Sequence, residues 1–205
     1  MHRLGIVTGL KREARCLNLL PAVSRPAFAI AAMDPGRAAQ AARRLLAEGC
    51  SALLSFGMAG GLDPALGPGT LVLAGSVRAP GGGTYGVDEA WRAALGAKIS
   101  APSVTLLGCD APVSDAAEKA RLFAETGAAI VDMESHAVAA VSAESNVPFL
   151  ALRAVADAAH RAVPRSALSG VGPDGATRTG KSFDLPEQGV KVCFVDTPGH
   201  DGTEG

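Results

Sequence analysis

Short apolar segments alternate with alanine-rich, amphipathic segments over most of the chain. Apolar, β-branched runs predict strands at 4–10, 27–33, 51–57, 70–79, 103–108, 128–133 and 148–156. Helical spacing of apolar residues predicts helices at 35–48, 88–97, 115–126 and 135–146. Several strands are apolar on both faces, as strands are when helices cover a sheet on each side. The pattern predicts an α/β domain with one mixed, mostly parallel sheet.

The pattern changes after about residue 165, so we divide the chain into a folded domain, 1–165, and a Gly/Pro-rich tail, 166–205. The tail contains GATRTGKS (175–182), which fits the phosphate-loop pattern G-x-x-x-x-G-K-[ST], and DTPGH (196–200). A phosphate loop needs a strand before the glycines and a helix after the Lys-Ser pair. The preceding ALSGVGPD is a poor strand, and Pro186 would break a helix that begins at Ser182. We therefore interpret the match as accidental and exclude a nucleotide triphosphatase.

Charge and aromatic content exclude a further class of function, nucleic-acid binding. The 205 residues carry a net charge of −1 and only 4% aromatic residues, and no basic cluster is interleaved with aromatic side chains. Nucleic acid is therefore not an expected partner. The first apolar run spans about seven residues, too short for a secretory signal or a transmembrane helix. We expect a cytoplasmic protein.

The four cysteines are scattered at 16, 50, 109 and 193, with no C-x-x-C pair and no histidine at ligand spacing. This spacing indicates neither a zinc site nor a disulfide framework. We expect reduced thiols, with Cys50 and Cys109 buried.

Candidate chemistry gathers where predicted strands end, which is where open α/β sheets place their sites. SFGMAGGLD (55–63) ends a strand in glycines that let backbone amides approach a ligand closely. VDMESHAVAAV (131–141) places Asp132 and Glu134 at a strand-to-helix junction, and LRAVADAAH (152–160) leaves Asp157 at the end of another strand. Taken singly, each has an ordinary explanation as a tight turn, a first-turn acid or a helix cap.

Taken together, GIVTGLKREA, SFGMAGGL, VDMESHAVA and LRAVAD resemble the purine nucleoside phosphorylase and nucleosidase family over roughly residues 3–165. The resemblance implies a three-layer α/β/α sandwich that cleaves the bond between a base and C1′ of ribose, with no metal or organic cofactor. Within the family the chain is most similar to the hopanoid-associated phosphorylases, which remove adenine from adenosylhopane. That branch implies a lipid-linked nucleoside met at the membrane surface, and the family implies a homodimer. The alternatives are a methylthioadenosine/adenosylhomocysteine nucleosidase and a nucleoside-binding protein without turnover.

The resemblance also implies roles for individual residues. Cleavage builds negative charge on the departing base, so an acid must protonate or hydrogen-bond a ring nitrogen. Asp157 would be that acid, while Glu134 would hold the ribose hydroxyls with Met133 packed against the sugar. Arg153 would either orient Asp157 or form an ion pair near the sheet edge.

The base would lie against the glycine-rich turn at Ala59 and Gly60. Adenine-specific members often place an aromatic ring after a G-D pair, but this chain reads GCDAPV (108–113). Pro112 and Val113 would cover the purine face there without aromatic stacking.

The resemblance leaves two alternatives for the group that attacks C1′, namely water and phosphate. In the hydrolytic branch a glutamate after the first strand activates water, and Glu13 occupies that place. In the phosphorolytic branch phosphate would lie near Thr8, Gly9 and Gly57.

Two departures from the family pattern affect the prediction. Ala156 stands where a serine frequently precedes the catalytic Asp. The tail replaces a helix that normally packs on the sheet, so either this branch has lost that helix or the chain end is aberrant. We place His136 and His160 outside the catalytic set.

Overall fold

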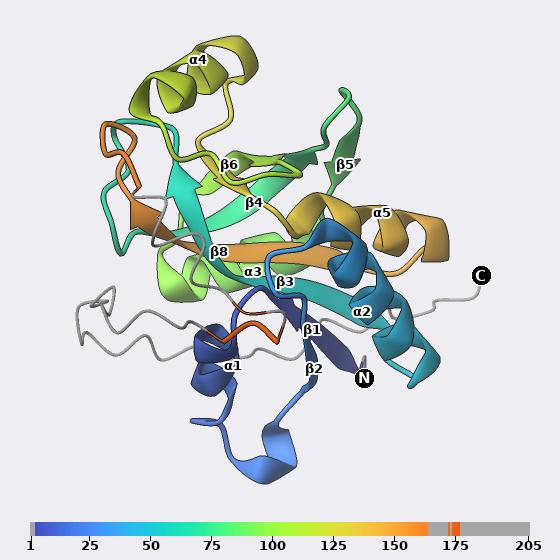
Figure 1. The fold of residues 1–205 in the computed structure, drawn as a ribbon. Coiled ribbons are helices and arrows are strands. Elements are labelled where there is room, and N and C mark those ends of the chain that lie inside the picture. The colour runs from blue at the N-terminus through green and yellow to red at the C-terminus, as the bar shows by residue number, and fades with distance from the viewer. Residues whose placement is uncertain (1–2, 164–171, 173, 177–205) are drawn as a thin grey trace.

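The computed structural model describes residues 3–163, 172 and 174–176 (Figure 1). The strands are β1 (Leu4–Thr8), β2 (Ala27–Ile30), β3 (Ala52–Gly61), β4 (Leu71–Arg78), β5 (Thr84–Gly86), β6 (Ser103–Gly108), β7 (Ile130–Asp132) and β8 (Phe149–Asp157). The helices are α1 (Lys11–Leu17), α2 (Pro35–Ala47), α3 (Glu89–Ile99), α4 (Ala116–Thr126) and α5 (Ser135–Ser145), with a short 3-10 helix at Ala22–Ser24.

The strands form one mixed sheet in the order β2-β1-β3-β7-β6-β4-β5, and β8 pairs with both β3 and β4. Parallel pairs join β1 to β2 and β3, β3 to β8, and β6 to β4 and β7. The pairs β3–β7, β4–β5 and β4–β8 are antiparallel. The predicted mixed, mostly parallel sheet is confirmed. Since β8 pairs with both β3 and β4, the strands β3, β7, β6, β4 and β8 form a closed ring.

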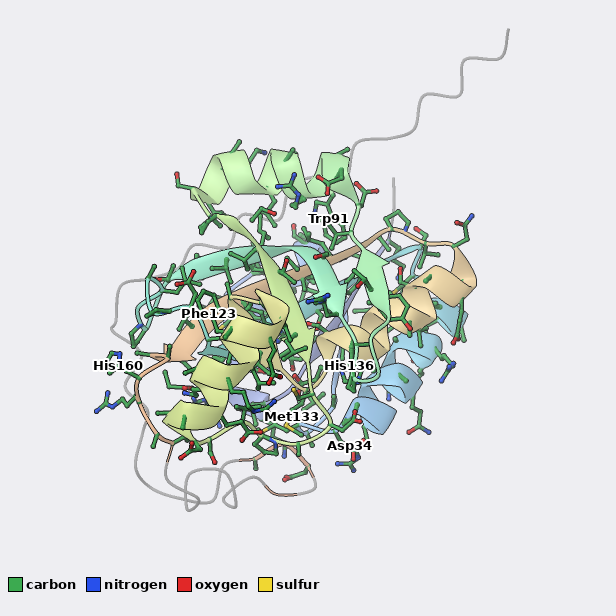
Figure 2. All side chains as sticks on the ribbon, turned by 90° about the horizontal axis from the view of Figure 1, so that it is seen from above. Asp34, Trp91, Phe123, Met133, His136 and His160 are labelled. Carbon is green, nitrogen blue, oxygen red and sulfur yellow. The ribbon has the colours of Figure 1, made fainter. Side chains whose placement is uncertain are left out.

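Helices cover both faces of this sheet. Side chains that alternate along β3 and β8 enter two separate cores: Leu53 packs on the side of α2 and α5, and Leu54 on the side of α1 and α3. Figure 2 shows α3, with Trp91 turned toward the sheet, on one side, and α2 and α5 on the other. A third core joins α4 to the β3, β6 and β7 ends through Leu122 and Phe123. The expected three-layer α/β/α fold is confirmed.

Aspartate side chains cap the starts of three helices. Asp34, Asp88 and Asp115 accept hydrogen bonds from exposed backbone amides in the first turns of α2, α3 and α4. The ends of α4 and α5 use left-handed residues, Gly127 and Asn146.

Several sequence-based boundaries differ from the structure, among them that of the strand predicted over 27–33, which ends at Ile30. The strand predicted over 4–10 ends at Thr8, and a seven-residue helix that was not predicted, α1, begins at Lys11. The strand predicted to end at residue 57 continues to Gly61, because Gly60 and Gly61 pair with β7 and β8. The three-residue β5 was not predicted. These segments are too short to carry a periodic signal.

Part of the predicted tail lies against the domain. The backbone N–H of Lys11 donates to the carbonyl oxygen of Gly175 (3.0 Å), and Lys11 Nζ pairs with Asp174 (2.6 Å). Gly175 has a φ of +74° and lies close to Ile30, which leaves no room for a side chain. Most of GATRTGKS and all of DTPGH lie outside the described residues.

The described cysteines are free thiols. Cys50 is buried as predicted, Cys109 is half-buried and Cys16 is exposed, while Cys193 lies outside the described residues. Burial raises the pKa of Cys109 to about 11, so this thiol is protonated near neutrality. Among the described helices, none is long and apolar enough to cross a membrane.

Candidate active site

The carboxyl ends of β1, β3 and β8 meet at one edge of the sheet because these strands pair in parallel. β1 turns there into α1, and β8 ends at Asp157. Between them, β3 ends in Gly57–Gly61, which we call the glycine segment. The predicted site residues Glu13, Glu134, Arg153 and Asp157 lie around this segment.

Arg153 is the centre of a buried polar network beneath the glycine segment. Its side chain is 1% exposed, and Nη2 donates to Ser55 Oγ (2.5 Å) and to Ser135 Oγ (2.9 Å). The same nitrogen lies 2.6 Å from Asp132 Oδ2 and 3.8 Å from Glu134 Oε2. Ser135 in turn donates to Asp132 Oδ2 (2.5 Å). One guanidinium therefore holds two carboxylates at the start of α5.

Glu13 is fixed by backbone amides from two elements. It is the third residue of α1, and Oε2 accepts from the N–H of Leu10 (2.7 Å), the residue directly before that helix. Oε1 accepts from the N–H of Met58 in the glycine segment (2.9 Å). Burial raises the pKa of Glu13, while Arg153 and these amides oppose the rise. Glu13 is thus a rigidly held carboxyl group with a basicity above the ordinary range.

Two glycines allow the carboxyl groups to approach the backbone. A Cβ on Gly9 would lie 2.6 Å from Glu134 Oε1, and one on Gly57 would lie 2.6 Å from Glu13 Oε1 and 2.7 Å from Arg153 Nη1. No side chain fits at such distances, so both positions require glycine. These contacts place Glu13, Glu134 and Arg153 around one small space.

Glu134 is 4% exposed and follows β7 directly before α5. Burial raises its pKa to about 8, with Asp132 and Glu13 adding to the rise and Arg153 opposing it. A carboxyl group in this state exchanges its proton near neutral pH.

Replacing Glu134 by Gln is expected to stabilise the protein more at pH 9 than at pH 5. Glu134 has a raised folded-state pKa, so its stabilising contribution is full below the ordinary value of 4.5 and is lost as the pH rises through about 8. Removing that penalty is worth on the order of a few kcal/mol at pH 9. Urea unfolding at both pH values measures the difference, and Glu144→Gln, at an exposed position paired with Arg43, is the control. Equal effects of E134Q at both pH values would contradict the burial argument.

Asp157 lies at the opposite end of the glycine segment. It is in register with Gly60, whose added Cβ would lie 3.7 Å from Oδ2, and its side chain is 14% exposed. Gly57 and Gly60 are three residues apart, which corresponds to about 10 Å along an extended strand. The glycine segment therefore separates Asp157 from the group formed by Glu13, Glu134 and Arg153.

The cation that contacts Asp157 is Lys119 of α4, whose Nζ donates to Asp157 Oδ2. Burial raises the pKa of Asp157, and Lys119 opposes that rise. Arg153, four residues before Asp157, forms its ion pairs with Asp132 and Glu134 instead.

The remaining predicted residues differ in exposure. Ala59 is buried, Gly60 and Met133 are half-buried, and Figure 2 shows Met133 near the start of α5. Val113 is half-buried against the core of α4, whereas Pro112 is exposed.

Thr8 is fully buried, and its hydroxyl lies 3.4 Å from the carbonyl oxygen of Leu10. His136 packs over Gly108 with Nε2 3.3 Å from Asp110, while His160 is exposed. Among the residues that the structure describes, no group of His, Cys, Asp and Glu has a metal-binding arrangement.

Sequence reasoning did not assign Lys119, Ser55 or Ser135 to the site. One feature of the sequence could have indicated Lys119. It lies on the same helix face as Leu122 and Phe123, where an apolar residue is expected rather than a charged one. The serines are indistinguishable from ordinary buried serines until the fold brings them to Arg153.

Both the sequence and the fold are similar to those of known proteins. The sequence profile of the Phosphorylase superfamily matches residues 23–179. The fold is similar to a 5′-methylthioadenosine/S-adenosylhomocysteine nucleosidase from Colwellia psychrerythraea 34H, solved with adenine, at a TM-score of 0.70 and 18% identity over 77% of this chain and 83% of that one. Futalosine hydrolase of Helicobacter pylori has a TM-score of 0.68 and 18% identity over 77% of this chain and 85% of that one. A Helicobacter pylori nucleosidase of the first kind, bound to butyl-thio-DADMe-Immucillin-A, has a TM-score of 0.68 and 20% identity with the same coverage. No curated protein sequence matches the chain.

Proposed function

Because the chain belongs to the phosphorylase superfamily, we propose that it is an enzyme that hydrolyses the N-glycosidic bond of an adenine nucleoside. The observation that carries this proposal is the arrangement along the glycine segment, with Asp157 at one end and Glu13, Glu134 and Arg153 at the other. Such cleavage needs an acid that protonates the departing purine and a general base that activates water at C1′. Asp157 is placed to be the acid, and Glu13 is placed to be the general base.

On the base side, Asp157 donates a proton or hydrogen bond to a ring nitrogen as the bond to C1′ breaks. Burial raises its pKa, which favours the acid form that donation requires. Ala59, Gly60 and Val113 lie against the base, and the exposed Pro112 lies at its rim.

On the ribose side, Glu134 accepts hydrogen bonds from the sugar hydroxyls and Met133 packs against the sugar. Arg153 keeps the Glu134 carboxyl turned toward this space through their 3.8 Å contact. Holding the sugar in one orientation contributes directly to the rate, because the reacting atoms start aligned.

The charge of the ribose side favours water over phosphate as the nucleophile. Asp132 Oδ2 lies 2.6 Å from the Arg153 guanidinium and balances its charge, and Glu13 and Glu134 are further acidic groups beside it, so a phosphate dianion there gains little from Arg153. The nearby Lys11 pairs with Asp174 at 2.6 Å. Glu13, with its raised basicity, takes the proton from water as the oxygen attacks C1′. Phosphorolysis near Thr8, Gly9 and Gly57 is the second candidate.

We propose two substrates that share adenosine and differ in the 5′ group. The resemblance of TGLKREARCL and DMESHAVAAV to hopanoid-associated phosphorylases favours adenosylhopane, and the structural likeness to methylthioadenosine nucleosidases favours methylthioadenosine. The adenosylhopane proposal carries with it a cytoplasmic homodimer that meets its substrate at the membrane surface.

Adenine release from a short-chain adenosylhopane analogue and from methylthioadenosine tests the proposal. We expect release from at least one of them, and the preferred substrate identifies the 5′ group. Saturable binding of both without release would support a nucleoside-binding protein and contradict the enzymatic proposal.

A further inference from the structure

Lys119 is buried completely, with a relative exposure of 0%. It occupies the first turns of α4, and its side chain reaches the end of β8. Its Nζ donates to Asp157 Oδ2, to the carbonyl oxygen of Arg161 (2.9 Å) and to that of Ala158 (3.3 Å). Three acceptors therefore satisfy the three N–H groups of the ammonium.

A buried ammonium is costly unless an anion compensates it, and an apolar side chain of similar size would fill the same space without that cost. The two carbonyl oxygens are neutral, so the ammonium is fully compensated only when Asp157 is ionised, as it is after it has donated a proton. A gain in stability therefore does not explain why a lysine is present at this position. Its effect on the neighbouring Asp157 carboxyl group offers an explanation.

We infer that Lys119 is a positioning residue that fixes Asp157 for proton donation and stabilises the carboxylate that donation leaves behind. The inference rests on the proposed function. As the C1′–N9 bond breaks, its electron pair moves into the purine, a ring nitrogen takes the proton from the Asp157 carboxyl, and water bonded to C1′ loses a proton to Glu13. Asp157 becomes a carboxylate, and the Lys119 ammonium already faces its Oδ2.

The surroundings of Asp157 suit this role. Among the residues that the structure describes, the charged groups that face it are Lys119 from α4 and Arg161 from the segment after β8, while β3 contributes Gly60 and Gly61. Lys119 occupies one carboxyl oxygen, Oδ2, which leaves Oδ1 for the base. Arg161 is exposed, so its charge is screened by solvent.

The test compares Lys119→Met with Arg121→Met, which removes the same charge from an exposed position of the same helix. Two substrates are used: methylthioadenosine, whose base needs a proton to leave, and 4-nitrophenyl riboside, whose leaving anion is stable without one. For K119M we expect kcat/KM to fall about 10- to 100-fold with methylthioadenosine, part of the general-acid effect, and less than about threefold with the nitrophenyl riboside. Equal losses on both substrates would reduce Lys119 to a structural residue and overturn the inference.

Two further measurements test the inference without comparing the two substrates. In an Asp157→Asn background, Lys119→Met should cause no further loss of kcat/KM, because removing both partners leaves no buried charge unpaired. A ¹³C NMR titration of the Asp157 carboxyl should give a higher pKa in K119M than in the wild type, since the ammonium lowers it. Unchanged titration would overturn the inference even if the wild type releases no adenine, whereas absence of wild-type turnover alone bears only on the proposed function.

Discussion

Replacing Glu13 by Gln is expected to lower kcat/KM for adenine release by a factor of about 10² to 10⁴, the range for loss of a general base. Both carboxyl oxygens of Glu13 accept from backbone N–H groups, those of Leu10 and Met58. Glutamine keeps the shape of the side chain, but it cannot take a proton from water. Its amide N–H₂ would also face one of these two donors.

Steady-state adenine release measures the effect, and Glu125→Gln, an exposed residue paired with Arg121, is the control. Binding of adenine should change little in E13Q, because Glu13 lies at the ribose end of the glycine segment. Activity within about threefold of the wild type would remove Glu13 from the mechanism and would favour phosphate as the nucleophile.

Replacing Arg153 by Met is expected to cost about 3–5 kcal/mol of unfolding free energy, the range for breaking a buried ion pair by removing one partner. Met fills the buried volume, but Asp132 and Glu134 lose the guanidinium that faces both of them. The loss should be smaller at pH 5 than at pH 8, because Glu134, whose pKa is raised to about 8, is protonated at pH 5 and then needs no cation.

Urea unfolding at both pH values tests this expectation, with Arg43→Met as the exposed control, for which about 0.5 kcal/mol or less is expected. If R153M does not fold, Arg153→Lys retains the charge but replaces the planar guanidinium by an ammonium on a shorter side chain. It should fold with reduced stability. A loss below about 1 kcal/mol for R153M would show that the network contributes little.

The alternation of apolar strands and alanine-rich helices was sufficient to predict the layered fold, because each long element carries its own periodicity. Glu134 and Asp157 were found from their positions after predicted strands, which the parallel sheet brings to one edge. Glu13 was found only through the family resemblance, since the two turns of α1 are too short to show a pattern. The structure adds the reason for its placement, namely amides from α1 and β3.

The contacts that define the charge state of the site were beyond prediction from the sequence. Lys119 and Asp157 are separated by 38 residues, and Arg153 and Ser55 by 98. Only the closure of the sheet through β8 brings these side chains together. The Gly57 contact with Glu13 depends equally on the fold, because the sequence predicts a glycine-rich turn where the structure has a strand continuing to Gly61.

The most direct test of the account is the identity of the sugar released from methylthioadenosine in phosphate-containing buffer, read by mass spectrometry. The arrangement of Glu13, Glu134 and Arg153 leads us to expect the free sugar, together with one equivalent of adenine. A sugar 1-phosphate would contradict the assignment of Glu13 as the base that activates water.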